Sequence, residues 1–147
     1  MTNTVIVILG PTASGKTDIA IKIAKKIDGE IISADSRQIY KYMNIGTNKP
    51  NGKWQIANGK RQYTVNNVPH YLIDIINPDK DFSVGNFVEL ANKKIKEIFN
   101  RGKTPMVVGG SGLYIKALTD GLIETPSNKS IRGKLNNKLK KYGLVYL

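Results

Sequence analysis

The stretch of this sequence best suited to chemistry is GPTASGKT, at positions 10–17. It fits the pattern GxxxxGK[ST], in which the glycines allow the backbone to turn its N–H groups toward phosphate oxygens. Lys16 would add a full positive charge, and Thr17 would add a hydroxyl suited to Mg²⁺. Taken alone, this loop predicts a phosphate site and is typical of proteins that bind ATP or GTP.

Two further groups of polar residues follow apolar runs. Asp35 and Ser36 end the run EIISADS, and GGSG at 109–112 follows PMVV. Asp35 could orient a metal or act as a general base, but it could equally cap the segment after it. Taken by itself, GGSG favours a tight strand-to-helix turn in which Ser111 caps the helix.

Three single residues are weaker candidates for a functional role. His70, the only histidine, lies between a proline and an apolar run, which favours a structural hydrogen bond over catalysis. Trp54 could stack on a base, although we expect it to anchor a loop. Asp74 is a poor match to the metal-ordering acid of nucleotide hydrolases because the residues before it are mixed, and this weakens the case for ATP.

Hydrophobic patterning supplies the elements that would position these groups. Apolar runs predict strands at 5–9, 30–36, 70–75 and 105–110, and apolar periodicity predicts helices at 18–27, 84–100 and 111–121. This alternation is typical of the α/β class, with a mostly parallel sheet flanked by helices on both faces. Ligands then bind at the carboxyl ends of the strands. We expect 5–9 to be a central strand, buried on both faces.

The first predicted helix would bury Ile19, Ile23 and Ile27 with Ala20 and Ala24, and Gly29 would end it. The stretch 48–69 is polar and contains two Asn-Gly pairs, so we expect an exposed insertion that forms a β-hairpin. The 147 residues are enough for one domain with a hydrophobic core.

The last part of the chain is strongly basic. No acidic residue follows Glu124, and the formal net charge of the whole chain is +12. From Lys129 onward a helix is predicted whose apolar stripe contains Ile131, Leu135, Leu139 and Tyr142, ended by Gly143. A tail of one charge sign favours a nucleic-acid partner. Because the chain then ends on apolar LVYL, we expect the fold to be incomplete at the C-terminus.

Composition limits the remaining possibilities. The absence of cysteine excludes disulfides and thiolate metal sites. The N-terminal apolar run is too short for a signal peptide or a membrane span. We expect a cytoplasmic, monomeric protein that has no contact with membranes.

In combination, GPTASGKT, ISADSRQIYKYMNIGTNKP, PHYLIDIINP, FSVGNF and VVGGSGLYIKALTDGL resemble the tRNA dimethylallyltransferase (IPP transferase) family. The resemblance runs in order from about residue 5 to 122. It implies a P-loop NTPase-like core domain over 1–147, the N-terminal half of the family's usual length, with an insertion near 48–69. It also implies transfer of the dimethylallyl group of dimethylallyl diphosphate to N6 of adenosine-37, beside the tRNA anticodon.

The resemblance assigns roles to particular residues. The phosphate loop would hold the diphosphate of the donor through Gly10, Pro11, Thr12, Ala13, Ser14, Gly15, Lys16 and Thr17. Asp35 would be the general base, Lys16 and Thr17 would share in catalysis, and Mg²⁺ would bind at Thr17. The residues implied to contact tRNA are Asp35, Ser36, Arg37, Gln38, Ser111 and Arg132.

Two alternatives remain beside this interpretation. One is a small-molecule kinase, which would use the same fold and loop to bind ATP. The other is a remnant without catalytic activity that binds nucleotide or RNA.

Overall fold

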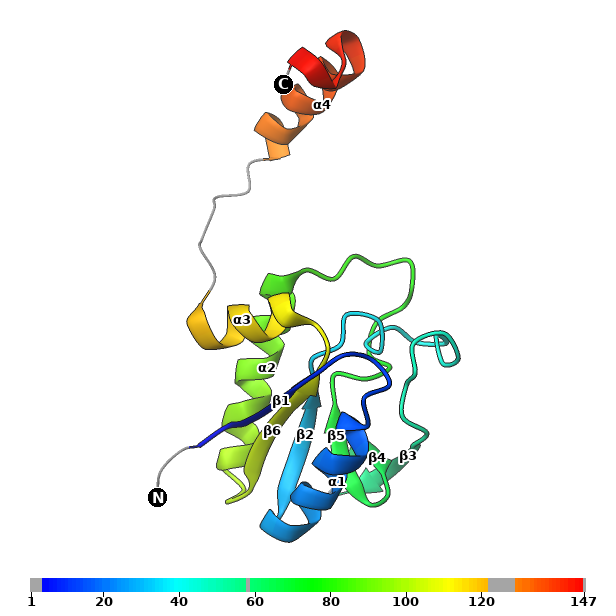
Figure 1. Cartoon of the computed structure of the whole chain (residues 1–147), viewed down its shortest axis with the longest axis vertical. Helices are drawn as coiled ribbons and strands as arrows, with labels where there is room; N and C mark the ends of the chain where they lie inside the picture. Colours follow the sequence, from blue (N-terminus) through cyan, green and yellow to red (C-terminus); the bar gives the residue numbers. More distant parts are fainter. Residues whose placement is uncertain (1–3, 58, 122–128, 147) are drawn as a thin grey trace.

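The computed structural model describes residues 4–57, 59–121 and 129–146. They form a six-stranded sheet with helices on both faces, which confirms the predicted α/β class (Figure 1). Across the sheet the strands are β1 (Ile6–Leu9), β6 (Thr104–Gly109), β2 (Gly29–Ser33), β5 (Val68–Tyr71), β4 (Lys60–Val65) and β3 (Lys53–Ala57). The first four run parallel, and β4 and β3 are antiparallel to their neighbours.

Three helices enclose two separate cores. Helix α1 (Lys16–Ile27) packs on one face of the sheet through Ala20, Ile21 and Ala24. Helices α2 (Val84–Phe99) and α3 (Gly112–Asp120) cover the other face, where Phe87 of α2 stacks on Tyr114 of α3 at 4.4 Å between ring centroids. None of the described helices combines the length and apolar character that a membrane span requires.

The first strand is not central, as the sequence analysis predicted, but lies at the edge of the sheet. Strand β6 takes the place between β1 and β2, and its Met106 and Val107 are fully buried. Ile6 and Ile8 of β1 pack into the core beneath α1, whereas Val7 and Leu9 on the opposite face are 40% and 57% exposed. An apolar run identifies a strand but does not specify its neighbours, so this prediction failed.

The predicted apolar face of α1 is also partly wrong. Ile19 and Ile27 are exposed, and the helix packs on the sheet through its alanines. The approach is close, because a Cβ built on Gly29 would lie 3.2 Å from Ala24 Cα. The helix ends before Gly29: Asp28 takes the left-handed conformation at φ 51°, and Gly29 is the first residue of β2.

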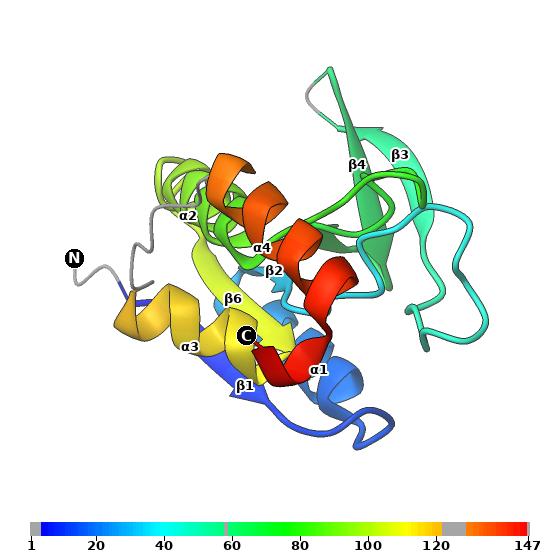
Figure 2. The same cartoon turned by 90° about the horizontal axis from the view of Figure 1, so that it is seen from above.

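The stretch 48–69 does form a hairpin, but it is not simply an exposed insertion. Strand β4 pairs with β5 through a tight turn at Asn66 and Asn67, whose φ angles are 49° and 65°, so the hairpin extends the main sheet. Figure 2 shows β3 and β4 at the end of the sheet far from α3. Tyr63 and Val65 are buried, and Trp54 packs edge-on against Tyr63 at 5.4 Å, as expected for an anchor.

Strand β5 begins and ends earlier than predicted, because Leu72 and Asp74 have φ angles of 59° and 55° and break the extended conformation. The predicted helix after it is confirmed as α2. A reciprocal pair of hydrogen bonds between Ser83 and Asn86 caps its start. After its end, Gly102 adopts φ 70°.

The basic helix is present as α4 (Lys129–Tyr142), followed by a single turn at Leu144–Tyr146. Its predicted apolar stripe is 38–56% exposed and lies outside both cores. In Figure 1, α4 stands apart from the sheet.

His70 makes the structural hydrogen bond that the sequence suggested. Its Nδ1 lies 2.9 Å from the carbonyl oxygen of Val68, and the side chain is buried. Nε2 has no hydrogen-bond partner among the described residues. Burial lowers the pKa of the imidazole. The folded state therefore keeps His70 neutral at a pH where the unfolded chain takes up a proton.

We expect stability to fall as the pH drops below about 6.5, the pKa of an unperturbed histidine. Urea unfolding at several pH values between about 7.5 and about 5.5 would show a slope of at most about 1.4 kcal/mol per pH unit. His70→Gln should remove this slope, because the chain has no other histidine. An unchanged slope in the variant would show that His70 does not cause the pH dependence.

Candidate functional site

A cavity of about 720 Å³ opens at the carboxyl ends of the parallel strands, where the sequence analysis placed the ligand site. It brings together the phosphate loop, the end of β2 and the segment that leads to β3. The predicted site residues that line it are Thr12, Ala13, Gly15, Lys16, Thr17, Asp35 and Gln38. The same cavity is therefore lined by a potential phosphate-binding loop and by the carboxylate of Asp35.

The phosphate loop has the backbone geometry that its glycines allow. Gly15, at φ 78°, stands directly before α1, so the N-terminus of this helix faces the loop. Lys16 Nζ donates to the carbonyl oxygen of Pro11 at 2.6 Å. Backbone N–H groups, a helix N-terminus and a lysine are the groups that typically bind phosphate in proteins.

Asp35 is positioned by the backbone that follows it. Its Oδ1 accepts hydrogen bonds from the N–H groups of Arg37 at 2.8 Å and of Gln38 at 3.3 Å. Asp35 thus caps this turn, which is one of the two roles left open by the sequence. No hydrogen bond to Oδ2 occurs among the described residues, so this oxygen is available to a ligand in the cavity.

The predicted cap at Ser111 is wrong in one respect. Ser111 precedes α3, but its side chain does not bond to that helix. Its Oγ instead accepts the N–H of Ser36 at 3.0 Å, and its own N–H donates to the carbonyl oxygen of Ala34 at 3.1 Å. Ser111 therefore ties the start of α3 to the segment that carries Asp35.

Glycines make this junction possible. A Cβ on Gly109 would lie 2.1 Å from the carbonyl oxygen of Ala34, which no side chain can tolerate. A Cβ on Gly110 would lie 3.3 Å from the carbonyl oxygen of Gly10 and 4.0 Å from Lys16 Nζ. The GGSG turn thus packs against both the phosphate loop and the end of β2.

Gln38 connects the end of β2 to the next loop. Its Oε1 accepts from the hydroxyl of Ser33 at 3.1 Å, and its Nε2 donates to the carbonyl oxygens of Thr47 and Asn48 at 3.4 and 3.2 Å. These three hydrogen bonds hold the side chain of Gln38 in place, which favours a positioning role.

Sequence reasoning missed Lys49. Its side chain is only 3% exposed, and it lies on the cavity wall. Nζ donates to the carbonyl oxygen of Tyr40 at 2.8 Å and to Oδ1 of Asn44 at 3.0 Å, and it forms an ion pair with Asp74. Asp74, considered above as a metal-ordering acid, is instead the partner of this lysine. A lysine in a polar stretch gives no sequence signal for such burial.

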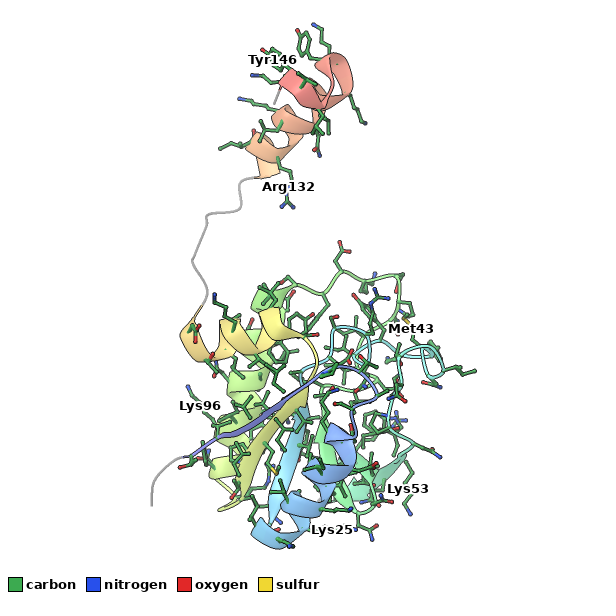
Figure 3. The ribbon with its side chains drawn as sticks, in the orientation of Figure 1. Lys25, Met43, Lys53, Lys96, Arg132 and Tyr146 are labelled. Atoms are coloured by element: carbon green, nitrogen blue, oxygen red, sulfur yellow. The ribbon has the colours of Figure 1, made fainter. Side chains whose placement is uncertain are left out.

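Other predicted residues lie outside the cavity lining. Gly10, Pro11 and Ser14 belong to the same loop, and Ser36, Arg37 and Ser111 adjoin Asp35 without lining the cavity. Arg132 is exposed on α4, well away from the sheet (Figure 3). Among the described residues there is no cluster of three or more His, Cys, Asp or Glu that could hold a metal.

Comparison with known proteins adds an independent finding. The family model described as IPP transferase matches residues 38–147. A tRNA dimethylallyltransferase from Acetivibrio thermocellus is 50% identical over 145 residues, covering 97% of this chain and 43% of the relative. A second, from Endomicrobium trichonymphae, is 52% identical over 135 residues, covering 91% of this chain and 44% of the relative.

Solved structures agree with these relatives. The full-length tRNA isopentenylpyrophosphate transferase from Bacillus halodurans matches with a TM-score of 0.72 at 38% identity, covering 97% of this chain and 44% of that one. A eukaryotic dimethylallyltransferase, described as acting on tRNA, matches with a TM-score of 0.70 at 31% identity, covering 90% of this chain and 31% of that one. The chain thus spans less than half the length of the relatives that it matches.

Removing Lys49 should destabilise the cavity wall, because Asp74 would lose its cation. We expect Lys49→Met to lower the free energy of unfolding by about 2–3 kcal/mol, less than for a fully buried pair because Asp74 keeps some contact with water. Urea unfolding would measure this change. Lys25→Met, which alters an exposed lysine on α1, should change stability by less than about 0.5 kcal/mol.

The double variant Lys49→Met, Asp74→Leu should regain part of the loss, because it leaves no unpaired charge. Equal stability of Lys49→Met and Lys25→Met would contradict the role given to the buried pair.

Proposed function

The chain belongs to the IPP transferase family, and on that premise we propose that it is the P-loop core domain of a tRNA dimethylallyltransferase. The proposed reaction transfers the dimethylallyl group of dimethylallyl diphosphate to N6 of adenosine-37 in tRNA. One observation carries this proposal: the same cavity is lined by the phosphate loop and by Asp35, whose Oδ2 has no partner among the described residues.

The phosphate loop would hold the leaving group. As the allylic carbon separates from its oxygen, negative charge accumulates on the diphosphate. Lys16, the loop N–H groups and the N-terminus of α1 would stabilise that charge. Diphosphate would thus be bound by backbone dipoles and one full charge, once Lys16 Nζ exchanges its bond to Pro11 for a phosphate oxygen.

Asp35 would act on the nucleophile. The lone pair of an adenine amino group is delocalised into the ring, so the nitrogen attacks poorly unless its proton is removed as the N–C bond forms. Hydrogen bonds to Oδ1 fix the orientation of the carboxylate and leave Oδ2 to take that proton. The adenosine would have to leave the anticodon-loop stack to reach this atom.

Magnesium fits the residues present. Mg²⁺ retains water and binds substrate phosphates, so it needs only one or two protein oxygens. Thr17 at the cavity wall offers a hydroxyl next to the proposed diphosphate position. When bound there, the ion would supply further positive charge to the leaving group.

The tRNA would be held by the segment 35–38, by Ser111 and by Arg132 of α4. The hydrogen bond between Ser111 and Ser36 supports a common role for the first two. Exposed lysines on α4 suit the phosphate backbone. We further propose that the protein acts as a monomer in the cytoplasm, where tRNA is found.

A transfer assay tests this function directly. The chain would be incubated with dimethylallyl diphosphate, Mg²⁺ and unmodified tRNA, and prenylated adenosine would be measured by mass spectrometry of the digested RNA. We expect product, and we expect Asp35→Ala to slow its formation about 10²–10⁴-fold, the usual contribution of a general base. Asp79→Asn, an exposed acid in a surface ion pair, is the matched control and should have little effect.

The alternatives give different outcomes in the same assay. Turnover of added ATP without prenylated adenosine would favour a kinase and overturn the proposal. RNA binding without any turnover would favour a remnant that only binds. Full activity of Asp35→Ala would reject the role assigned to this carboxylate.

A further inference from the structure

The loop between Tyr40 and Lys49 is firmly anchored at its base. The N–H of Lys41 donates to the carbonyl oxygen of Ile76 at 2.8 Å, and the N–H of Ile75 donates to the carbonyl oxygen of Ile39 at 2.9 Å. Lys49 Nζ donates hydrogen bonds to Tyr40 and Asn44 of the same loop. The side chain of Gln38 donates to the carbonyl oxygens of Thr47 and Asn48. The loop is therefore held in place relative to Asp35.

The tip of this loop, residues 42–45, exposes apolar side chains. Tyr42 is 82% exposed and Ile45 is 97% exposed, with Met43 at 36% between them. Figure 3 shows Met43 in the loop region beyond the carboxyl ends of the parallel strands. Rigid anchoring and apolar exposure together are typical of a surface that a partner covers.

The charge of the surrounding chain indicates what kind of partner this is. No acidic residue occurs in the sequence between Asp35 and Asp74, and the two cations next to the tip are Lys41, directly before it, and Arg37. Arg37 is exposed, two residues after Asp35. The tip is apolar and aromatic, and the charged residues next to it in the sequence are all basic. Such a surface complements a polyanion with unstacked bases, which is what the loop of an RNA offers.

The backbone at Tyr42 is also unusual. Its φ of 64° lies in the left-handed region, which an aromatic residue adopts at a cost and glycine adopts freely. Of the eight non-glycine residues at positive φ among the described residues, Tyr42 is the one whose ring lies on the exposed tip. Backbone strain of this kind clusters at functional sites.

We propose that the tip 42–45 is a docking surface for unstacked nucleobases of the RNA loop, with the ring of Tyr42 as the stacking platform. This inference rests on the proposed function, since it assumes an RNA partner. It extends that function by giving the target loop a second contact beyond Asp35–Gln38, one made with bases rather than with phosphates.

Binding experiments without prenyl donor test this inference separately from catalysis. The RNA would be an unmodified anticodon stem–loop, and the comparison RNA would be the same stem as a blunt duplex. Affinity would be measured for the wild-type chain, Tyr42→Gly, Tyr42→Phe and Ile45→Ser. Ile56→Ser, at a residue 73% exposed on β3, is the matched control for loss of an exposed aliphatic side chain.

We expect Tyr42→Gly to weaken stem–loop binding about 5- to 100-fold, the range for loss of one base–aromatic stack. Tyr42→Phe should bind like wild type, because stacking needs only the ring. Ile45→Ser should bind more weakly than Ile56→Ser. The dependence of affinity on salt should keep its slope in Tyr42→Gly, since no phosphate contact is lost.

Thermal melting supplies a readout that a purely structural residue would not give. Tyr42→Gly should melt at the same temperature as wild type or higher, because glycine relieves the φ strain. Loss of affinity with retained stability would therefore assign the ring to binding. Loss of both together would overturn the proposal.

Other outcomes would also overturn it. Equal affinity of wild type and Tyr42→Gly for the stem–loop would reject the stacking role, and so would an equal loss on the blunt duplex. Retained RNA affinity with altered self-association in sedimentation would assign the tip to protein contact instead. Failure of the wild-type chain to bind the stem–loop would reject the RNA partner of the proposed function itself, which distinguishes the two failures.

Discussion

The contact between the end of β6 and the backbone after β2 holds the candidate site together. Gly109 lies so close to the carbonyl oxygen of Ala34 that any side chain at this position would collide with it. Around this point, Ala34 N–H donates to Val108, Ser111 N–H donates to Ala34, and Gly10 N–H donates to Gly109. Three turns that are distant in the sequence are thereby joined through backbone hydrogen bonds. The phosphate loop, Asp35 and Ser111 take their places from this junction, because each follows one of the joined strands directly.

This arrangement explains why the sequence predicted the site better than the sheet. The loop at 10–17, Asp35 and GGSG each follow an apolar run, and the carboxyl ends of parallel strands must meet at one edge. That rule holds whatever the order of the strands. The order itself depends on which strands pair, and this is why Ile6–Leu9 was expected at the centre but lies at the edge. The face of α1 was misjudged for a similar reason, since close packing on β2 selects Ala20 and Ala24 over the larger Ile19 and Ile27.

Other features had no signal in the sequence. Lys49 is buried because its own loop, through Tyr40 and Asn44, and the segment at Asp74 supply oxygen atoms around its ammonium group, and these come together only in the folded chain. Ser111 looked like a helix cap because serine commonly has that role, but the N–H of Ser36 competes for its hydroxyl. Side chains that bridge distant segments depend on tertiary structure, so residue type and spacing do not identify them.

The candidate site thus combines the phosphate loop with the carboxylate of Asp35, which is held by the turn after it. The anchored loop between Tyr40 and Lys49 lies beside them. This combination suits a reaction in which the phosphates are discarded rather than transferred. In the proposed reaction, positive charge at the loop would stabilise a leaving diphosphate, while Asp35, after a different strand, would take the proton from a second substrate. The central claim is therefore that the loop at 10–17 binds a prenyl diphosphate in preference to a nucleotide.

A competition titration distinguishes these two ligands. An unreactive thio-analogue of dimethylallyl diphosphate would be titrated calorimetrically into the chain with Mg²⁺, alone and in the presence of ATP, and then into Lys16→Met. We expect one site for the analogue, little displacement by ATP, and a large loss of affinity in Lys16→Met. Tight binding of ATP that displaces the analogue, or undiminished analogue binding in Lys16→Met, would contradict this expectation.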